Sequence, residues 1–172
     1  AKRLDAVVFA SDVRPQVKEQ VESLGGRFVE VKSDENFETA GGYARETSAE
    51  YKQKQQEAVA EQLTKTNFAV TTALIPGLPA PRLITKAMLS AMPAGAVVVD
   101  MASSAGGNVE GSEDGKTVVI NGVTVIGNSN LAASLPASAS PLYAKNILNF
   151  LDTMYNKEEK SLNYNFEDEL IK

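Results

Sequence analysis

The 172-residue chain contains no histidine and no cysteine. Without histidine, it lacks the commonest general base and the commonest metal ligand of proteins. Without cysteine, it can form no disulfide, no thiolate zinc site and no thiol nucleophile. Any chemistry in this chain must therefore proceed without imidazole or thiolate, and we expect no metal site.

The sequence also has neither an excess of basic residues nor a long hydrophobic run. Its net charge of −5 argues against a nucleic-acid-binding surface. No apolar run reaches the roughly 18 residues of a membrane span, and nothing resembles a signal peptide, so we expect no direct membrane insertion. What the chain does have is 43% hydrophobic residues, enough to bury one sizeable core.

Short β-rich runs alternate with helical patterns, which is typical of a parallel sheet with crossover helices. The sequence therefore predicts an α/β fold with a doubly wound parallel, Rossmann-like sheet. The expected strands are 6–10, 27–31, 67–71, 96–100 and 123–126, with 117–120 as a small extra ribbon.

The expected helices alternate with these strands. The first ends at Gly25, the second begins at the capping box of Thr47 and Glu50, and the third covers about 83–92. Ser140 and Pro141 are expected to begin the last helix as its N-cap and first residue. Its expected buried side chains are Leu142, Tyr143, Ile147, Phe150 and Leu151.

Asp12 follows the first expected strand, where a carboxylate could bind an adenosine ribose. Such an acid accepts hydrogen bonds from both ribose hydroxyls and repels a 2′-phosphate. A helix N-cap explains Asp12 just as well. Arg14 could accommodate a 2′-phosphate, but the acid tips the balance toward NAD.

In a dinucleotide-binding unit, a strand, a glycine-rich turn and a helix precede this acid by about 20 residues. Only residues 1–11 precede Asp12, so we expect the sheet to lack its first strand and the Gly-rich loop in this chain. That strand would lie between those at 6–10 and 67–71. We predict that these two strands do not pair directly, and that an upstream segment or a second copy fills the gap.

Three loops could carry further binding residues. The polar loop around 41–46 is either a flap that lays Tyr43 over a nucleotide or, as physics alone favours, a solvated surface loop. The loop 71–81 either presents backbone groups to a flat ligand or is a tight connection packed on its neighbour. The loop 100–108 is expected to line the site rather than to take part in catalysis, because no base is evident to activate its serines.

These loops resemble the NAD(H)-binding component of proton-translocating nicotinamide nucleotide transhydrogenase, which is its domain I or alpha subunit. The resemblance implies a partial NAD(H)-binding Rossmann domain over 1–153. Residues 154–172 are expected to form a C-terminal tail or ribbon, because Leu162, Tyr164 and Phe166 alternate at a spacing of two. The matching segments are SDVRPQVKEQVESLGGRF, TAGGYARE, TTALIPGLPAPRLI, VVVDMASSAGGN and SPLYAKNILNF.

The resemblance assigns cofactor binding to an adenosine-binding segment, a mobile loop and a loop beside the cofactor. In that order, the matching residues are Asp12, Val13 and Arg14, then Gly42 and Tyr43, then Thr72, Ala73 and Leu74. No catalytic side chain is implied, because hydride transfer between two nicotinamides requires alignment rather than proton transfer. The chain departs from the family at Asp5, where a helix-ending glycine is usual, and at 131–134, which lacks a common arginine.

The resemblance also implies cofactors and partners. The complete protein would pass a hydride from NADH to NADP⁺ on a separate domain, coupled to proton movement through a membrane domain. NAD(H) would bind here and NADP(H) on the partner domain, within a homodimer of the NAD(H)-binding component. The implied location is the cytoplasmic face of the inner membrane, or the matrix in a mitochondrion.

Two alternatives remain at this point. The related alanine dehydrogenase family shares the IPGxxAP and VVVD-type segments, but it lacks the loop of Gly41, Gly42 and Tyr43. A non-catalytic scaffold or subunit fragment could retain the fold and make only protein contacts.

Overall fold

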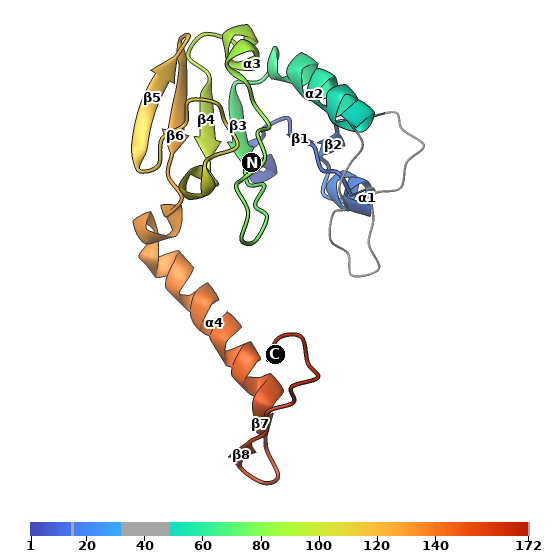
Figure 1. The fold of residues 1–172 in the computed structure, drawn as a ribbon, viewed down its shortest axis with the longest axis vertical. Coiled ribbons are helices and arrows are strands. Elements are labelled where there is room, and N and C mark those ends of the chain that lie inside the picture. The colour runs from blue at the N-terminus through green and yellow to red at the C-terminus, as the bar shows by residue number, and fades with distance from the viewer. Residues whose placement is uncertain (15, 32–48, 172) are drawn as a thin grey trace. The chain divides into compact units, whose positions relative to one another are not determined.

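The computed structural model describes residues 1–14, 16–31 and 49–171, with the backbone only for residues 16 and 49–52 (Figure 1). Internal contacts divide the chain into two compact units, Ala1–Ser129 and Asn130–Lys172. The division differs from the expected domain boundary after residue 153, which stays a prediction. The loop that carries Gly42 and Tyr43 lies outside the described residues, as do Thr47 and the side chain of Glu50, the two members of the expected capping box.

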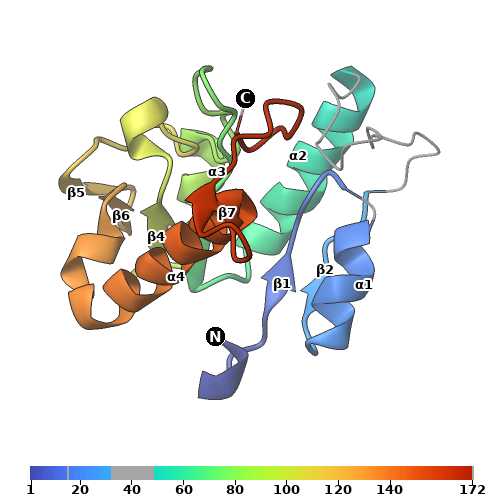
Figure 2. The same ribbon diagram turned by 90° about the horizontal axis from the view of Figure 1, so that it is seen from below.

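A small parallel sheet begins the first unit. β1 (Phe9–Ala10) pairs with β2 (Arg27–Phe28), and α1 (Gln16–Ser23) connects them, as Figure 2 shows. After α1, Gly25 adopts a φ of 76°, a conformation that suits glycine, and its amide donates to the Glu22 carbonyl. The expected strand–helix–strand pattern and its closing glycine are thus confirmed, with shorter strands than the sequence predicted.

A larger sheet of strand order β3-β4-β6-β5 follows. β3 (Phe68–Thr71), β4 (Val97–Asp100) and β6 (Val123–Gly127) are parallel, which confirms the predicted α/β fold with a parallel Rossmann-like sheet. β5 (Lys116–Ile120) is antiparallel to β6 and is the small extra ribbon that the sequence predicted.

The two sheets share no hydrogen-bonded ladder within the described part of the chain. β1 and β3 therefore do not pair directly, as the expected strand order requires. β3 lies at an edge of its sheet, and Phe68 and Val70 on it are 58% and 50% exposed. Phe68 and Val70 alternate with Ala69, which packs against the core, so their exposure belongs to the opposite face of β3. What fills the gap stays a prediction.

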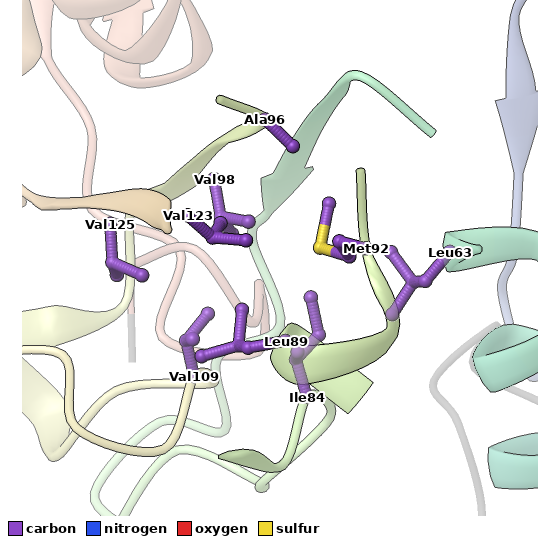
Figure 3. Close-up of a cluster of buried hydrophobic side chains, with 9 residues drawn as sticks. All are labelled: Leu63, Ile84, Leu89, Met92, Ala96, Val98, Val109, Val123 and Val125. Carbon is purple, nitrogen blue, oxygen red and sulfur yellow. The ribbon is translucent and has the colours of Figure 1, made fainter. Parts of the chain in front are cut away.

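The core gathers side chains from the larger sheet, from α3 (Lys86–Ala91) and from the end of α2 (Ala49–Leu63). Thr85 caps α3, because its hydroxyl accepts a hydrogen bond from the Met88 amide at 3.2 Å. Figure 3 shows the buried cluster of Leu63, Ile84, Leu89, Met92, Ala96, Val98, Val109, Val123 and Val125. This core fixes the strands whose ends carry the candidate site.

The second unit consists mainly of α4 (Pro136–Met154). The predicted start of this helix at Ser140 is wrong, because Pro136 occupies the first turn and Pro141 lies inside the helix. The amides of Ser138 and Ala139 already donate to the Leu135 carbonyl at 3.1 and 2.9 Å. A proline at the first helical position loses no intrahelical bond, so Pro136 serves the start as well as Pro141 would.

The apolar side chains of α4 are exposed, contrary to the prediction that they are buried. Their exposed fractions lie between 40% and 69% for Leu142, Tyr143, Ile147, Phe150 and Leu151. The prediction failed because a helical period identifies an apolar face without identifying a surface that covers it.

The chain ends in the ribbon that the sequence allowed. β7 (Tyr155–Asn156) and β8 (Ser161–Leu162) pair antiparallel, and beyond them the rings of Tyr164 and Phe166 stack with centroids 6.5 Å apart. None of the helices within the described ranges has the length and apolar character needed to cross a membrane.

Candidate functional site

The parallel strands of the larger sheet end in one row. Thr71, Asp100 and Gly127 are register partners at the carboxyl ends of β3, β4 and β6. Ligands of doubly wound folds bind outside this edge of the sheet. The loops that follow these strands, together with the turn after β1, therefore form the candidate site.

Asp12 lies in the turn after β1 and is held by Arg14. Its Oδ1 accepts from the Arg14 amide and from Arg14 Nε, each at 2.9 Å, and its Oδ2 accepts from Arg14 Nη2 at 2.8 Å. The Asp12 side chain is 26% exposed and that of Arg14 43%. The bond to the amide two residues on forms an Asx turn, so the described bonds of Asp12 stay within this turn and are not an N-cap of α1.

Arg14 lowers the pKa of the Asp12 carboxyl group. Partial burial raises the pKa of Asp12, but the side-chain bond, the backbone bond and the charge of Arg14 together outweigh it, so the pKa lies below its ordinary value. Asp12 in turn raises the pKa of Arg14. Arg14 fills three of the roughly four acceptor positions of a carboxylate, so Asp12 can receive two ribose hydroxyls only if Arg14 moves.

Asp100 also ends a strand, but it is completely buried. Its Oδ1 accepts from the Ala102 amide at 3.0 Å and from Thr71 Oγ1 at 3.4 Å, and its Oδ2 accepts from the Val109 amide at 3.0 Å. A Cβ on Gly107, whose φ is 80°, would lie 2.7 Å from Oδ2. Asp100 therefore organises the loop that follows β4 and is not free to bind a ligand.

Asn108 joins that loop to the loop that follows β3. Its buried Nδ2 donates to the carbonyls of Ala73 at 2.9 Å and Pro81 at 2.7 Å, and its Oδ1 accepts from the Ala73 amide at 3.0 Å. Thr72 and Leu74, on either side of Ala73, are exposed. The loop 71–81 is thus packed on its neighbour and also presents side chains outward, so both sequence interpretations remain compatible with it.

Ser103 has a partner that sequence reasoning did not identify. Its Oγ donates to Asp114 Oδ1 at 2.7 Å, and Ser129 Oγ donates to the same oxygen at 2.9 Å. These bonds lower the pKa of Asp114. A carboxylate with a lowered pKa is a weaker base, so the arrangement ties three loops together and does not activate Ser103 as a nucleophile.

The hydrogen bonds group the predicted residues into two sets. Asp12 and Arg14 form one, with the half-buried Val13 between them, and the Ala73 backbone with Asn108 forms the other. The anchoring roles of Asp100 and Asn108 were missed, although a strand-ending acid before Gly-Gly-Asn was a usable signal. The parts of the chain that the structure describes contain no cluster of three or more acidic residues suited to a metal ion.

Comparison with known proteins places these features in a family. The family model described as "Alanine dehydrogenase/PNT, C-terminal domain" matches residues 1–172. The chain is 53% identical over 173 residues to an NAD(P) transhydrogenase alpha-subunit polypeptide of Rhodospirillum rubrum, covering 99% of this chain and 45% of that relative. A crystal structure of transhydrogenase from Sinorhizobium meliloti matches with a TM-score of 0.70 and 46% identity, over 89% of this chain and 39% of that one.

A more distant relative is the alanine dehydrogenase of Lysinibacillus sphaericus, which is 25% identical over 162 residues, 91% of this chain and 38% of that protein. The chain spans less than half the length of the curated relatives it matches. The family model, in contrast, matches from the first residue to the last. The chain therefore belongs to the alanine dehydrogenase/PNT C-terminal domain family.

Proposed function

We propose that this chain is part of the NAD(H)-binding domain of a proton-translocating transhydrogenase. The observation that carries the proposal is the 53% identity over nearly the whole chain to a transhydrogenase alpha subunit. Identity to an alanine dehydrogenase is only 25%, which disfavours the alanine dehydrogenase alternative.

Asp12, Val13 and Arg14 would hold the adenosine end of NAD(H). The Asp12 carboxylate stays ionised beside Arg14 and is 26% exposed, so it can accept a ribose hydroxyl without first losing a proton. Its negative charge disfavours the 2′-phosphate of NADP(H), while the adjacent Arg14 reduces that penalty.

Thr72, Ala73 and Leu74 would lie beside the cofactor. They follow β3 at the carboxyl edge of the parallel sheet, the edge at which dinucleotides bind. Gly42 and Tyr43 would contribute a mobile loop that orders over the nucleotide, a role that the resemblance alone supports.

NADH, when bound, supplies the hydride. The residues of this chain would bind and orient the cofactor, and none would transfer a proton, because alignment of the two nicotinamides is what the reaction requires. The acceptor, NADP⁺, would be held by a separate partner domain, and a membrane domain would couple the reaction to proton movement.

The assembly around the chain belongs to the same proposal. The NAD(H)-binding component would form a homodimer on the cytoplasmic face of the inner membrane, or in the matrix of a mitochondrion. Solution scattering of the complete subunit would test the dimer, since a monomeric mass at micromolar concentration would contradict it.

Titration of NADH fluorescence tests cofactor binding. We expect the chain alone to bind weakly, with a dissociation constant above about 1 μM, because it contains no Gly-rich phosphate-binding loop. With the upstream half of an alpha subunit supplied, we expect saturable binding of NADH. Absence of binding in that mixture would contradict the proposal and favour a scaffold role.

An activity assay separates the two enzyme families. The full-length protein that carries this sequence should reduce an NADP⁺ analogue with NADH when the partner domain is present. Oxidation of L-alanine with NAD⁺, in the absence of that transfer, would favour the alanine dehydrogenase alternative.

A further inference from the structure

We propose that Asn108 is a positioning residue that fixes the loop of Thr72, Ala73 and Leu74 before nucleotide binds. This inference rests on the proposed function, since that loop is the one beside the cofactor. Asn108 itself is completely buried, so it acts through Ala73 and does not touch the nucleotide.

The side chain of Asn108 extends the sheet ladder beyond the end of β3. The last ladder contact of β3 is the bond from the Met101 amide to the Thr71 carbonyl at 3.0 Å. Two residues farther along, Asn108 accepts from the Ala73 amide at 3.0 Å and donates to the Ala73 carbonyl at 2.9 Å. A side-chain amide thus takes the place of a neighbouring strand, and both backbone groups of Ala73 are fixed.

Asn108 cannot follow the loop if the loop moves. Its carbonyl accepts from the amides of Leu83 at 2.8 Å and Ile84 at 3.0 Å, and the next amide, that of Val109, donates to buried Asp100. Ile84 and Val109 both belong to the hydrophobic core (Figure 3). The two hydrogen bonds between the Asn108 side chain and the Ala73 backbone form a clamp on Ala73, and this clamp is therefore anchored in the buried core of the unit.

The exposure pattern of the loop shows what the clamp achieves. Ala73 is held, whereas Thr72 and Leu74, its two neighbours, have exposed side chains, with Leu74 57% exposed. A loop that is ordered before binding has less conformational entropy to lose when its ligand arrives. Removing the clamp should therefore weaken NADH binding by more than its effect on overall stability explains.

The test uses Asn108→Asp in the full-length protein that carries this sequence. The substitution keeps the shape of the side chain but removes the two N–H donors to the Ala73 and Pro81 carbonyls. We expect the dissociation constant for NADH to rise about tenfold, which corresponds to about 1.4 kcal/mol.

Two control variants separate positioning from general destabilisation. Asn121→Asp makes the same chemical change at an exposed asparagine whose described side-chain bond goes to Ser90, and should leave NADH affinity unchanged. Val125→Ala opens the core at a completely buried site outside the loop, and should lower the melting temperature without the affinity loss.

Equal affinity losses in Asn108→Asp and Val125→Ala, at similar melting temperatures, would overturn the positioning role. Failure of the unsubstituted protein to bind NADH would instead refute the proposed function. If Asn108→Asp does not fold, amide exchange in the unsubstituted protein decides: protection of the Ala73 amide without nucleotide supports the clamp, and exchange at the rate of an unstructured amide overturns it.

Discussion

Asp12 and Asp100 look alike in the sequence, since each lies at or just beyond the end of a parallel strand, yet they differ in burial and in hydrogen-bond partners. Asp12 is 26% exposed and bonds to Arg14, two residues away. Asp100 is completely buried and accepts hydrogen bonds from the backbone of its own loop and from Thr71 on the neighbouring strand. The carboxylate of Asp12 remains accessible to a ligand, whereas the acceptor oxygens of Asp100 are occupied by hydrogen bonds within the protein.

Burial decides what a strand-ending acid does. A buried carboxylate must be satisfied by protein donors, so it becomes a structural anchor for the loop around it. A carboxylate that is only partly buried, such as Asp12, remains in contact with solvent, so its pair with an arginine contributes little to stability and the carboxylate can exchange its partner for a ligand. Substitutions at the two sites should therefore have different consequences.

Asp100→Ala should destabilise the protein strongly. It leaves the buried Ala102 and Val109 amides without their acceptor, at about 1–3 kcal/mol each, so the free energy of unfolding should fall by about 2–6 kcal/mol. Urea unfolding followed by circular dichroism measures this. Asp12→Ala is the matched control and should cost less than about 1 kcal/mol. Equal losses in the two variants would show that burial does not distinguish the roles of the two carboxylates.

Asp12→Asn should weaken NADH binding in the completed domain by about 1–3 kcal/mol, the usual cost of losing a charged hydrogen-bond partner. Discrimination against NADPH should relax as well, because the negative charge that repels a 2′-phosphate is gone. Fluorescence titrations with both nucleotides measure the two effects. Unchanged affinity for both would remove Asp12 from the site.

Arg14→Ala should sharpen the preference for NADH over NADPH. It frees the Asp12 carboxylate of a partner that is 43% exposed, and such a surface pair is worth about 0.2–1 kcal/mol. The dissociation constant for NADPH, divided by that for NADH, should therefore rise by a factor of about 1.4 to 5. A fall in this ratio would show that Arg14 does not help the site to accept a 2′-phosphate.

The pH dependence of stability should carry a small signature of Asp12. Because its pKa is lowered in the folded protein, the contribution of the ion pair is fully present above the ordinary value of 3.8 and is lost as the pH falls through the lower folded value. The difference in unfolding free energy between the unsubstituted protein and Asp12→Asn should vanish in that acidic range. A difference that persisted there would mean that the negative charge of Asp12 is not the source of this stability difference.

Local sequence patterns predicted much of the fold. Short β-rich runs located the strands of the larger sheet, and Gly25 correctly marked the end of the first helix. The start of α4 was wrong because Pro136 and Pro141 satisfy the same local rule, and only the bonds to the Leu135 carbonyl distinguish them.

The candidate site was predicted less completely. Asp12 and the loop of Thr72 to Leu74 were identified from strand ends and from the family resemblance, whereas Asn108 was overlooked. Its partner Ala73 lies 35 residues away, and no local pattern reports a bond of that separation. The pairing of Ser103 with Asp114 was missed for the same reason.

Short stretches of sequence are enough to indicate the alternation of strands and helices and the acids at the strand ends, because both depend on neighbouring residues. The family resemblance rests on five matching segments distributed along the chain. The three-dimensional fold was needed to show that Asp100 is an anchor, that Asp12 stays accessible beside Arg14 and that Asn108 holds Ala73. Burial and hydrogen-bond partnership depend on which distant segments the fold brings together, and that information is absent from any short stretch of the chain.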